Sequence, residues 1–348
     1  MYYASCGIRN LDNVRKDIYF NLALKLIKRP PGLSVYSNYL KYKVALWQKK
    51  TVVSHFPVSL VFYTNKICNF KCSFCYNQDV LNKKKALESD LTLEQFKKIM
   101  ENPFGKAALR IAFLGGEPFL NSNIFEFINY GHKKRKITNV VTNASQLKGS
   151  LLEDLVKSPI DVVGISLYDN NADDVARVVK RLNEARKLYW VQTVASAQNL
   201  NAIKQNIDFG LDIKCRNLII SNYNPYFDKK YENILTKDNR DYFQLEKSLR
   251  LSTENKMNIQ WLNAIESGPR LKKSCKMPFS YAHVDNQGNI GSCCFRYPDA
   301  NKFGNIYSDE NWNTTETVKI RKNLITTDSE PIDECKDCEN LVRDLYGV

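Results

Sequence analysis

The spacing of apolar residues along this chain changes several times, and from residue 58 onward strand-like and helix-like spacing alternate regularly. Short apolar runs, typical of buried strands, alternate with stretches in which apolar residues recur every three or four positions. The predicted strands are 59–64, 109–114, 137–142, 161–167, 190–194 and 217–221, and the predicted helices are 93–101, 124–134, 151–157, 173–187 and 200–209. This repeat predicts an α/β fold with parallel strands and right-handed crossovers. Because six strands are fewer than the eight of a closed barrel, we expect a partial barrel or an open sheet.

The rest of the chain has other patterns. Before the repeat, helical periodicity runs over 18–27, stops at Pro30-Pro31-Gly32, and returns over 36–47. After it, residues 222–255 are polar and aromatic and predict one helix. From residue 268 periodicity is weak and cysteines are frequent, which indicates a small domain held together by metal. We therefore predict four segments, namely an N-terminal helical extension (1–56), an α/β core (57–222), a connecting or substrate-covering segment (223–267) and a cysteine-rich domain (268–348).

Composition places the chain among soluble proteins and gives it a strong positive charge. Of 348 residues, 43% are hydrophobic, and we find neither a membrane-length apolar run nor a secretory signal at the N-terminus, so we expect a cytoplasmic protein without a membrane partner. The net charge is +14, from 51 Lys and Arg against 37 Asp and Glu. This charge fits a lysine-rich solvated surface, or attraction of an anionic substrate such as an acidic peptide, a phosphorylated sugar or RNA. The absence of a Walker A loop and of a GxGxxG motif after the first strand disfavours nucleotide hydrolysis and nicotinamide binding.

Ten cysteines in a reducing compartment indicate metal ligands rather than a disulfide framework. The tightest group is Cys68-Asn69-Phe70-Lys71-Cys72-Ser73-Phe74-Cys75, directly after the first predicted strand. Three thiolates at this spacing can hold three corners of a cubane iron–sulfur cluster and leave the fourth iron open to a small molecule. The alternatives are an incomplete zinc site and three structural thiols.

Three further positions follow the ends of predicted strands. Gly115-Gly116-Glu117 ends the second strand, where two glycines allow a close backbone approach and Glu117 can accept from an ammonium group; a plain tight turn is the alternative. Asn143 and Ser166 end the third and fourth strands, and for each the residue pattern fits loop capping as well as ligand binding.

The late cysteines form a second group. Cys275, Cys293, Cys335 and Cys338 can close a structural zinc site or a fully ligated [4Fe–4S] cluster, and spacing alone slightly favours zinc. Cys294 adjoins this group and could replace Cys293 as a ligand, donate a hydrogen atom, or be inert. We expect Cys6 and Cys215 to be inert, and the three scattered histidines to be structural or exposed; they are His55, His132 and His283.

Taken in this order, the early motifs resemble those of the radical S-adenosylmethionine (SAM) superfamily. The resemblance implies a partial (β/α)6 TIM-like barrel in residues 57–222, with Cys68, Cys72 and Cys75 holding a [4Fe–4S] cluster whose open iron is chelated by SAM. It further implies that Phe74 lies beside the adenine and that Gly115, Gly116 and Glu117 meet the amino group of SAM. Relatives often have Thr-Asn-Gly where this chain has Thr142-Asn143-Ala144, and often contact the ribose near the position of Ser166.

The C-terminal segment resembles the auxiliary-cluster extension called SPASM, or its shorter form, twitch. The similarity rests on the late cysteines and on Gly288-Asn289-Ile290-Gly291-Ser292-Cys293, Phe303-Gly304-Asn305-Ile306 and Trp312-Asn313. A full SPASM domain has about seven cysteines, more than this chain has from Cys275 onward, so the one-cluster form fits better. The resemblance then implies an auxiliary [4Fe–4S] cluster on Cys275, Cys293, Cys335 and Cys338.

These resemblances imply an enzyme that cleaves SAM reductively and uses the resulting 5′-deoxyadenosyl radical to abstract hydrogen from an unactivated C–H bond. The auxiliary cluster would accept an electron, and a donor such as flavodoxin or ferredoxin would supply one. We expect a ribosomally made peptide as the substrate of oxidation, crosslinking or epimerisation, ahead of a sugar or cyclitol that is dehydrogenated or epimerised. A reading from another class is a non-catalytic nucleic-acid-binding protein with metal knuckles, which explains the charge but not the open cysteine loop.

Overall fold

The computed structural model describes residues 13–72, 75, 90–225, 229–262, 264, 273, 275–293, 303–308, 311–326, 329–336 and 338. The chain divides into two compact units. One consists of Met1–Lys28 and Val141–Gly268, and the other, which we call the cysteine unit, consists of Arg29–Val140 and Pro269–Val348. The predicted iron–sulfur ligands all belong to the cysteine unit.

The strands of the cysteine unit follow the order β3-β2-β1-β8-β9. Their bounds are β1 Ser59–Tyr63, β2 Arg110–Leu114, β3 Ile137–Thr142, β8 Tyr281–Val284 and β9 Ile290–Gly291. β1 pairs in parallel with β2 on one side and with β8 on the other, whereas β9 is antiparallel to β8. Because β1 lies between two parallel neighbours and all five of its residues are buried, it is the central strand of this unit.

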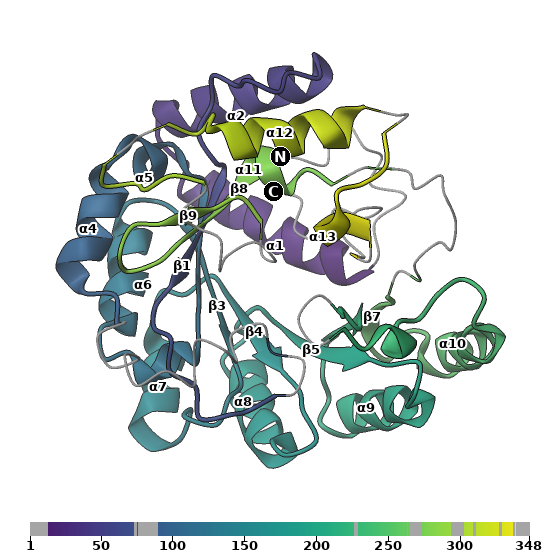
Figure 1. The fold of residues 1–348 in the computed structure, drawn as a ribbon. Coiled ribbons are helices and arrows are strands. Elements are labelled where there is room, and N and C mark those ends of the chain that lie inside the picture. The colour runs from purple at the N-terminus through teal and green to yellow at the C-terminus, as the bar shows by residue number, and fades with distance from the viewer. Residues whose placement is uncertain are drawn as a thin grey trace. The chain divides into compact units, whose positions relative to one another are not determined.

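Helices cover this sheet on its outer side, where α4 and α6 lie (Figure 1). The helices of the cysteine unit are α2 Leu33–Trp47, α4 Leu93–Glu101, α5 Pro103–Ala107, α6 Ile124–Lys133, α11 Met277–Ser280, α12 Thr315–Ile325 and α13 Asp333–Lys336. Helix α4 starts at a capping box in which Thr92 and Gln95 satisfy each other's backbone N–H groups. Rings of the sheet and the helices then pack on each other, with Phe96 lying 4.8 Å from both Phe62 and Phe127 between ring centroids.

The other unit contains four parallel strands in the order β4-β5-β6-β7. They are β4 Val162–Ser166, β5 Tyr189–Ala195, β6 Asn217–Asn222 and β7 Asn258–Gln260, and the helices are α1 Asn13–Lys28, α7 Gly149–Lys157, α8 Ala172–Glu184, α9 Leu200–Asp212 and α10 Arg240–Thr253. Helix α1 is tied to this sheet because the carboxylate of Asp17 accepts a hydrogen bond of 2.8 Å from the side-chain amide of Asn217.

The six predicted strands and the five helices between them are present, and the α/β class with an open, mostly parallel sheet is confirmed. The predicted core of residues 57–222 has the six expected strands, β1–β6; three further strands among the described residues, β7, β8 and β9, lie after the core and were not predicted. These three have only two to four residues each, too few to show alternation or a clear apolar run. The four segment boundaries given above stay predictions.

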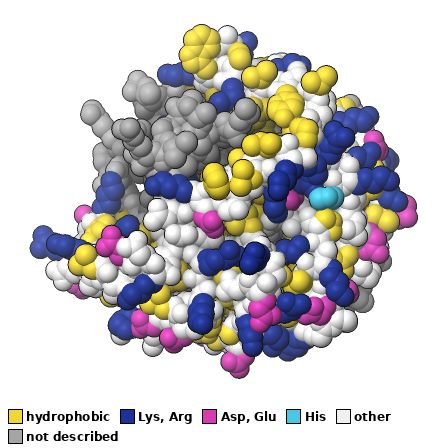
Figure 2. All heavy atoms as spheres, turned by 180° about the vertical axis from the view of Figure 1, so that it is seen from behind, with side chains coloured by type: hydrophobic (Ala, Val, Ile, Leu, Met, Phe, Trp, Pro, Cys, Tyr) yellow, Lys and Arg dark blue, Asp and Glu magenta, His cyan; other side chains and the backbone are white. Residues whose placement is uncertain are grey.

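Two surface properties bear on function. Among the described residues, none of the helices combines the length and the apolar content that crossing a membrane requires. Lys and Arg side chains are scattered over the face shown in Figure 2 rather than gathered in one patch. The positive charge therefore marks the surface broadly and by itself points to no single site.

Candidate functional site

The early cysteine loop continues directly from the central strand β1. Cys68, Cys72 and Cys75 are half-buried thiols, and the backbone N–H of Cys75 donates to the carbonyl of Cys72 at 3.0 Å. The backbone N–H of Phe70 donates to the sulfur of Cys68 at 3.4 Å. Such an amide stabilises a thiolate, so the loop has the donor chemistry that an iron–sulfur cluster needs. Phe74 lies outside the described residues.

The Gly115-Gly116-Glu117 turn, which follows β2, is bonded to the start of this loop. The N–H of Gly116 donates to the carbonyl of Asn65 at 3.0 Å, and the N–H of Glu117 donates to the carbonyl of Ile67 at 2.7 Å. A Cβ placed on Gly116 would lie 1.7 Å from the Ile67 carbonyl oxygen, and one on Gly115 would lie 2.4 Å from that of Asn65. Gly115 also has a φ of +132°. The glycines are therefore required by the close approach of the cysteine loop itself.

Glu117 is fixed inside this turn. Its side chain is 1% exposed, and one carboxylate oxygen accepts from the N–H of Phe119 at 3.2 Å, which caps the short 3₁₀ helix Pro118–Leu120. A buried, capped carboxylate is held in one orientation. Its predicted contact with the amino group of SAM stays a prediction.

Asn65 was missed in the sequence, and it joins the loop and the turn through its side chain. Its amide nitrogen donates to the carbonyl of Glu117 at 2.8 Å. Its amide oxygen is fully buried and accepts no hydrogen bond from the described part of the chain. A buried acceptor of this kind is costly unless a donor reaches it. Since the atom lies between the cysteine loop and the glycine turn, the site fits a ligand that carries N–H donors, as SAM does.

Asn65→Leu is accordingly expected to raise the dissociation constant for SAM by about tenfold, since one charge-assisted hydrogen bond is lost. SAM binding by equilibrium dialysis on anaerobic protein measures this without turnover. The matched variant is Asn65→Asp, which keeps the acceptor but loses the donor to Glu117, and it is expected to bind SAM at least as well as Asn65→Leu does. Unchanged SAM affinity in Asn65→Leu, with normal iron content, would show that the amide oxygen faces no ligand.

Two of the late cysteines meet on one apolar cluster. Cys275, just before α11, and Cys293, just after β9, both pack against the cluster formed by Val61, Ala112, Met277 and Tyr281. Val61 belongs to β1 and Tyr281 to β8, so these two cysteines sit against the strand pair from which the early cysteine loop continues. The structure thus connects the two cysteine groups through the sheet of one unit.

A buried aromatic group occupies the same strand pair. The Tyr281 hydroxyl lies 2.5 Å from Nε2 of His283, and the ring of His283 lies 4.9 Å from the ring of Tyr63 on β1. Burial lowers the pKa of His283 to about 3, so the imidazole is neutral at physiological pH. His283, predicted to be structural or exposed, is a buried packing residue.

The other two late cysteines lie on and just after α13. The N–H of Cys335 donates to the carbonyl of Ile332 at 2.8 Å, and the N–H of Cys338 donates to that of Cys335 at 3.2 Å. Across the ranges that the structure describes, no three Cys, His, Asp or Glu side chains already converge as a metal site. The sets Cys68/Cys72/Cys75 and Cys275/Cys293/Cys335/Cys338 therefore stay predicted ligand sets, and Cys294 lies outside the described residues.

Arg321 on α12 is a second residue that the sequence did not reveal. Its fully buried guanidinium donates to the carbonyls of Pro278, Thr51 and Trp312 at 2.8, 3.1 and 3.0 Å. The rings of Phe279 and Trp312 flank it at 5.7 and 5.0 Å. Burial lowers its pKa to about 9. Because Pro278 and Phe279 belong to α11, this cation fixes the short helix that follows Cys275.

Asn143 and Ser166 belong to the other unit, where the hydroxyl of Ser166 accepts from the side-chain amide of Gln192 at 3.3 Å and Asn143 bonds within its own loop. Asn143 accepts from the N–H and the hydroxyl of Ser145 at 3.0 and 2.6 Å through its side-chain oxygen. The side chain of Asn171 donates to the carbonyls of Asn143 and Ser166, each at 2.8 Å, and so joins the loop of Asn143 to the end of β4 within this unit. Ala144 has a φ of +66°, a conformation that favours glycine. Any contact of Asn143 or Ser166 with SAM stays a prediction.

Two known protein families match this chain, one over the early cysteine loop and one over the late cysteines. Residues 62–212 match the radical SAM superfamily, and residues 275–339 match SPASM, described as an iron–sulfur cluster-binding domain. The first match contains the early cysteine loop and the glycine turn, and the second contains all four late cysteines. These matches bear out the expected cofactors, which are SAM, a [4Fe–4S] cluster and auxiliary iron–sulfur.

Individual relatives are similar over shorter segments. The chain is 34% identical over 119 residues to the subtilosin biosynthesis protein AlbA of Bacillus subtilis (34% of this chain, 25% of AlbA). It is 25% identical over 122 residues to the PqqA peptide cyclase of Granulibacter bethesdensis (35% and 32%), and 33% identical over 156 residues to an S-adenosylmethionine-dependent nucleotide dehydratase of Lacinutrix mariniflava (42% and 32%). The matched segments thus span a quarter to a third of these relatives.

A solved structure extends the likeness to most of the fold. Streptococcus suis SuiB bound to precursor peptide SuiA superposes with a TM-score of 0.64 at 20% identity, covering 88% of this chain and 74% of SuiB. At that identity the likeness concerns the fold, and it agrees with the partial barrel predicted from the strand pattern. The chain is therefore a radical SAM enzyme, with a radical SAM core followed by a SPASM domain.

Proposed function

We propose that this enzyme modifies a ribosomally made peptide by oxidation, crosslinking or epimerisation, which begins with hydrogen abstraction from an unactivated C–H bond. The observation that carries the proposal is the arrangement in the cysteine unit, where the loop after β1 is bonded to the glycine turn and the late cysteines Cys275 and Cys293 pack against β1 and β8. This arrangement supports one strand pair serving both a site for SAM cleavage and a site for a second cluster, which could accept an electron where the reaction is an oxidation.

The choice of a peptide is supported by the names of the relatives. AlbA takes part in bacteriocin biosynthesis, and four PqqA peptide cyclases are among the other relatives. A net charge of +14 suits an acidic peptide. The nucleotide dehydratase match supports a nucleotide as the competing substrate class, which the same charge would also attract.

Some residues of the chain would hold the clusters, and others would position SAM. When bound, the [4Fe–4S] cluster and SAM supply a one-electron cleavage that leads to hydrogen abstraction, for which an external donor such as flavodoxin or ferredoxin provides the electron. Cys68, Cys72 and Cys75 would hold the cluster, and Gly115–Glu117 with Asn65 would orient the amino group of SAM. Cys275, Cys293, Cys335 and Cys338 would hold the auxiliary cluster, and Arg321 fixes the helix beside Cys275.

The proposal is tested by anaerobic assay with a synthetic peptide encoded beside the gene. We expect 5′-deoxyadenosine to form faster with the peptide than without it. We also expect either a peptide mass lower by two hydrogen atoms, or an unchanged composition with uptake of solvent deuterium at an α-carbon. Stimulation by nucleotides or sugar-type molecules, and not by the peptide, would move the substrate to the small-molecule class.

The auxiliary ligand set is tested by Cys335→Ala. We expect the variant to lose about four of about eight iron atoms per chain and to keep some SAM cleavage that is uncoupled from peptide product. Iron, zinc and acid-labile sulfide on anaerobic protein, together with deoxyadenosine and peptide product, measure this. Full iron content in the variant contradicts the assignment, and zinc in the wild-type protein would make this site structural.

A further inference from the structure

Helix α2 in the cysteine unit is held firmly by one of its faces. The side chain of Asn38 donates to the carbonyls of Phe56 and Ala107 at 3.0 and 3.3 Å, and accepts from the N–H of Phe56 at 2.8 Å. The buried ring of Tyr42 packs edge-on against His55 at 5.2 Å, and His55 in turn bonds to the carbonyl of Phe279 on α11. The helix is therefore anchored to α5 and to the α11 segment that follows Cys275.

The opposite face of α2 is apolar and exposed to solvent. At 100° per residue, its apolar positions fall within an arc of about 80° over a length of about 21 Å. Leu40 and Trp47 in this arc are 64% and 82% exposed. We call this surface the α2 stripe, and its members are Leu33, Tyr36, Leu40, Val44 and Trp47. Apolar side chains are exposed at the top of the molecule in Figure 2, where Figure 1 places α2.

A contiguous stripe of this kind on a well-anchored helix is unusual for a surface that faces only water. Its spacing of three, four, four and three residues is the pattern by which one amphipathic helix recognises another. The inner face of α2 makes the contacts that hold the helix in the fold, so the stripe can bind a partner without disturbing them.

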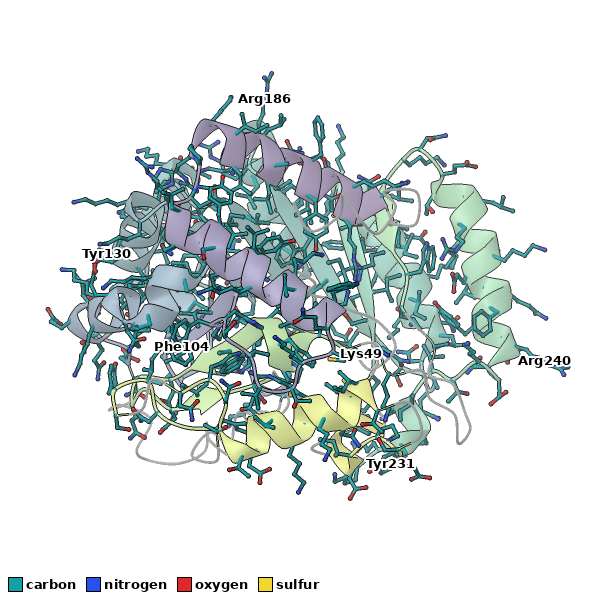
Figure 3. All side chains as sticks on the ribbon, turned by 90° about the horizontal axis from the view of Figure 1, so that it is seen from above. Lys49, Phe104, Tyr130, Arg186, Tyr231 and Arg240 are labelled. Atoms are coloured by element: carbon teal, nitrogen blue, oxygen red, sulfur yellow. The ribbon has the colours of Figure 1, made fainter. Side chains whose placement is uncertain are left out.

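The charge around the stripe selects the chemistry of that partner. Residues 29–56 of the cysteine unit, which contain α2, include five Lys and Arg and not one Asp or Glu. At 100° per residue, Lys41 and Lys43 fall on the two flanks of the stripe. Lys49, labelled in Figure 3, follows the C-terminal end of α2. An apolar strip between two basic edges is complementary to an amphipathic helix with acidic edges. A second copy of this chain would instead bring like charges together.

We propose that the α2 stripe docks an acidic, amphipathic helical segment of the peptide substrate, separate from the residues that react. This inference rests on the proposed function, because it assigns the partner to the substrate. Docking on a helix tied to the α11 segment would hold the peptide by a part that is not consumed, so that affinity and reactivity are set by different regions of the substrate.

The probe is a fluorescein-labelled synthetic helix of sixteen residues, with Leu at three- and four-residue spacing and Glu on both flanks. Its control is a peptide of the same composition in scrambled order. Fluorescence anisotropy on the anaerobic, unreduced holoenzyme measures binding without turnover. We expect the patterned peptide to bind at least about tenfold tighter than the scrambled one, and the affinity to fall as salt is raised.

Two variants locate the binding. Leu40→Ser combined with Trp47→Ser removes apolar area, and Lys41→Glu combined with Lys43→Glu reverses the flanking charge; each pair is expected to weaken binding about tenfold or more. The control is Leu251→Ser on α10, a leucine that is 72% exposed in the other unit and is expected to change nothing. Leu40, Lys41 and Trp47 are exposed and Lys43 is half-buried. Unfolding temperature and SAM cleavage without peptide are therefore measured for each pair and should stay at wild-type values.

Several outcomes overturn the inference. Equal affinity for the patterned and the scrambled peptide means non-specific charge attraction. Binding to vesicles of 30% phosphatidylserine that Trp47→Ser abolishes, with no peptide binding, would assign the stripe to a membrane surface. Concentration-dependent dimers in sedimentation that Leu40→Ser disrupts would assign it to a second copy. The proposed function fails separately, because a peptide can bind here and still not be modified, or be modified without binding here.

Discussion

Cys72→Ala is expected to form no 5′-deoxyadenosine above background and to contain about half the iron of the wild-type protein. Cys72 is the middle member of the loop, and its carbonyl accepts the N–H of Cys75, so its thiol and its backbone both belong to the tightest part of the motif. Without Cys72, two thiolates would remain to hold the cluster and two of its four irons would lack a protein ligand, which would make the cluster unstable. Iron and sulfide analysis with the electron paramagnetic resonance spectrum of the reduced protein measures the loss.

Cys215→Ala is the matched control for that experiment. Cys215 is buried in the other unit, its thiol donates to the carbonyl of Asn217 at 3.3 Å, and burial raises its pKa to about 12, so it remains a protonated thiol. This variant is expected to keep full iron and wild-type SAM cleavage. Deoxyadenosine formation by Cys72→Ala, at any rate comparable with that control, would overturn the assignment of the early loop.

Gly116→Ala is expected to lower SAM affinity and cleavage by at least about tenfold, even though it adds a single methyl group. That methyl would be placed 1.7 Å from the Ile67 carbonyl oxygen, which belongs to the backbone and cannot rotate away. The turn and the loop must then separate, and the bonds from Gly116 to Asn65 and from Glu117 to Ile67 are lost. Calorimetric SAM binding and deoxyadenosine formation, both anaerobic, give the two readings.

Gly32→Ala separates this effect from a general intolerance of glycine substitution. Gly32 precedes α2 with a φ of −69°, and the nearest atom to an added Cβ is the Ser34 hydroxyl at 4.0 Å. The control is expected to match the wild-type protein in SAM binding and unfolding temperature. Wild-type behaviour of Gly116→Ala would mean that the cysteine loop moves freely against the turn.

The core repeat could be predicted from sequence because its strands and helices carry their own periodicity. β3 and α4 have the predicted bounds, and the other core elements differ by a few residues. The helices and strands of the C-terminal part were harder to predict, because their buried faces are not uniformly apolar. Helix α12 buries Thr317, Ile320, Arg321 and Leu324, so an arginine stands where an apolar residue would have revealed the face. Its burial depends on carbonyls far along the chain, which no local pattern shows.

Part of the candidate site could also be predicted from the sequence, and part could not. Cysteine spacing and the glycine turn can be seen in the sequence because the chemistry is local. The reason for the glycines could not be found there, since they meet the backbone of residues fifty positions earlier. Asn65 has no motif of its own, and its importance arises only when its side chain is placed between two loops.

The parallel pairing of β1 with β8 has a consequence for how this protein folds and how it could be shortened. β8 is supplied by the C-terminal segment, yet it lies next to the central strand and in register with it from Ser59 to Phe62. The C-terminal segment is thus part of the same cooperative unit as the strand that leads into the early cysteines. A chain cut before residue 275 would leave one edge of β1 unpaired and would expose Val61 and Ala112, which pack against Met277 and Tyr281. During synthesis, the central strand must likewise wait for the last quarter of the chain before its pairing is complete.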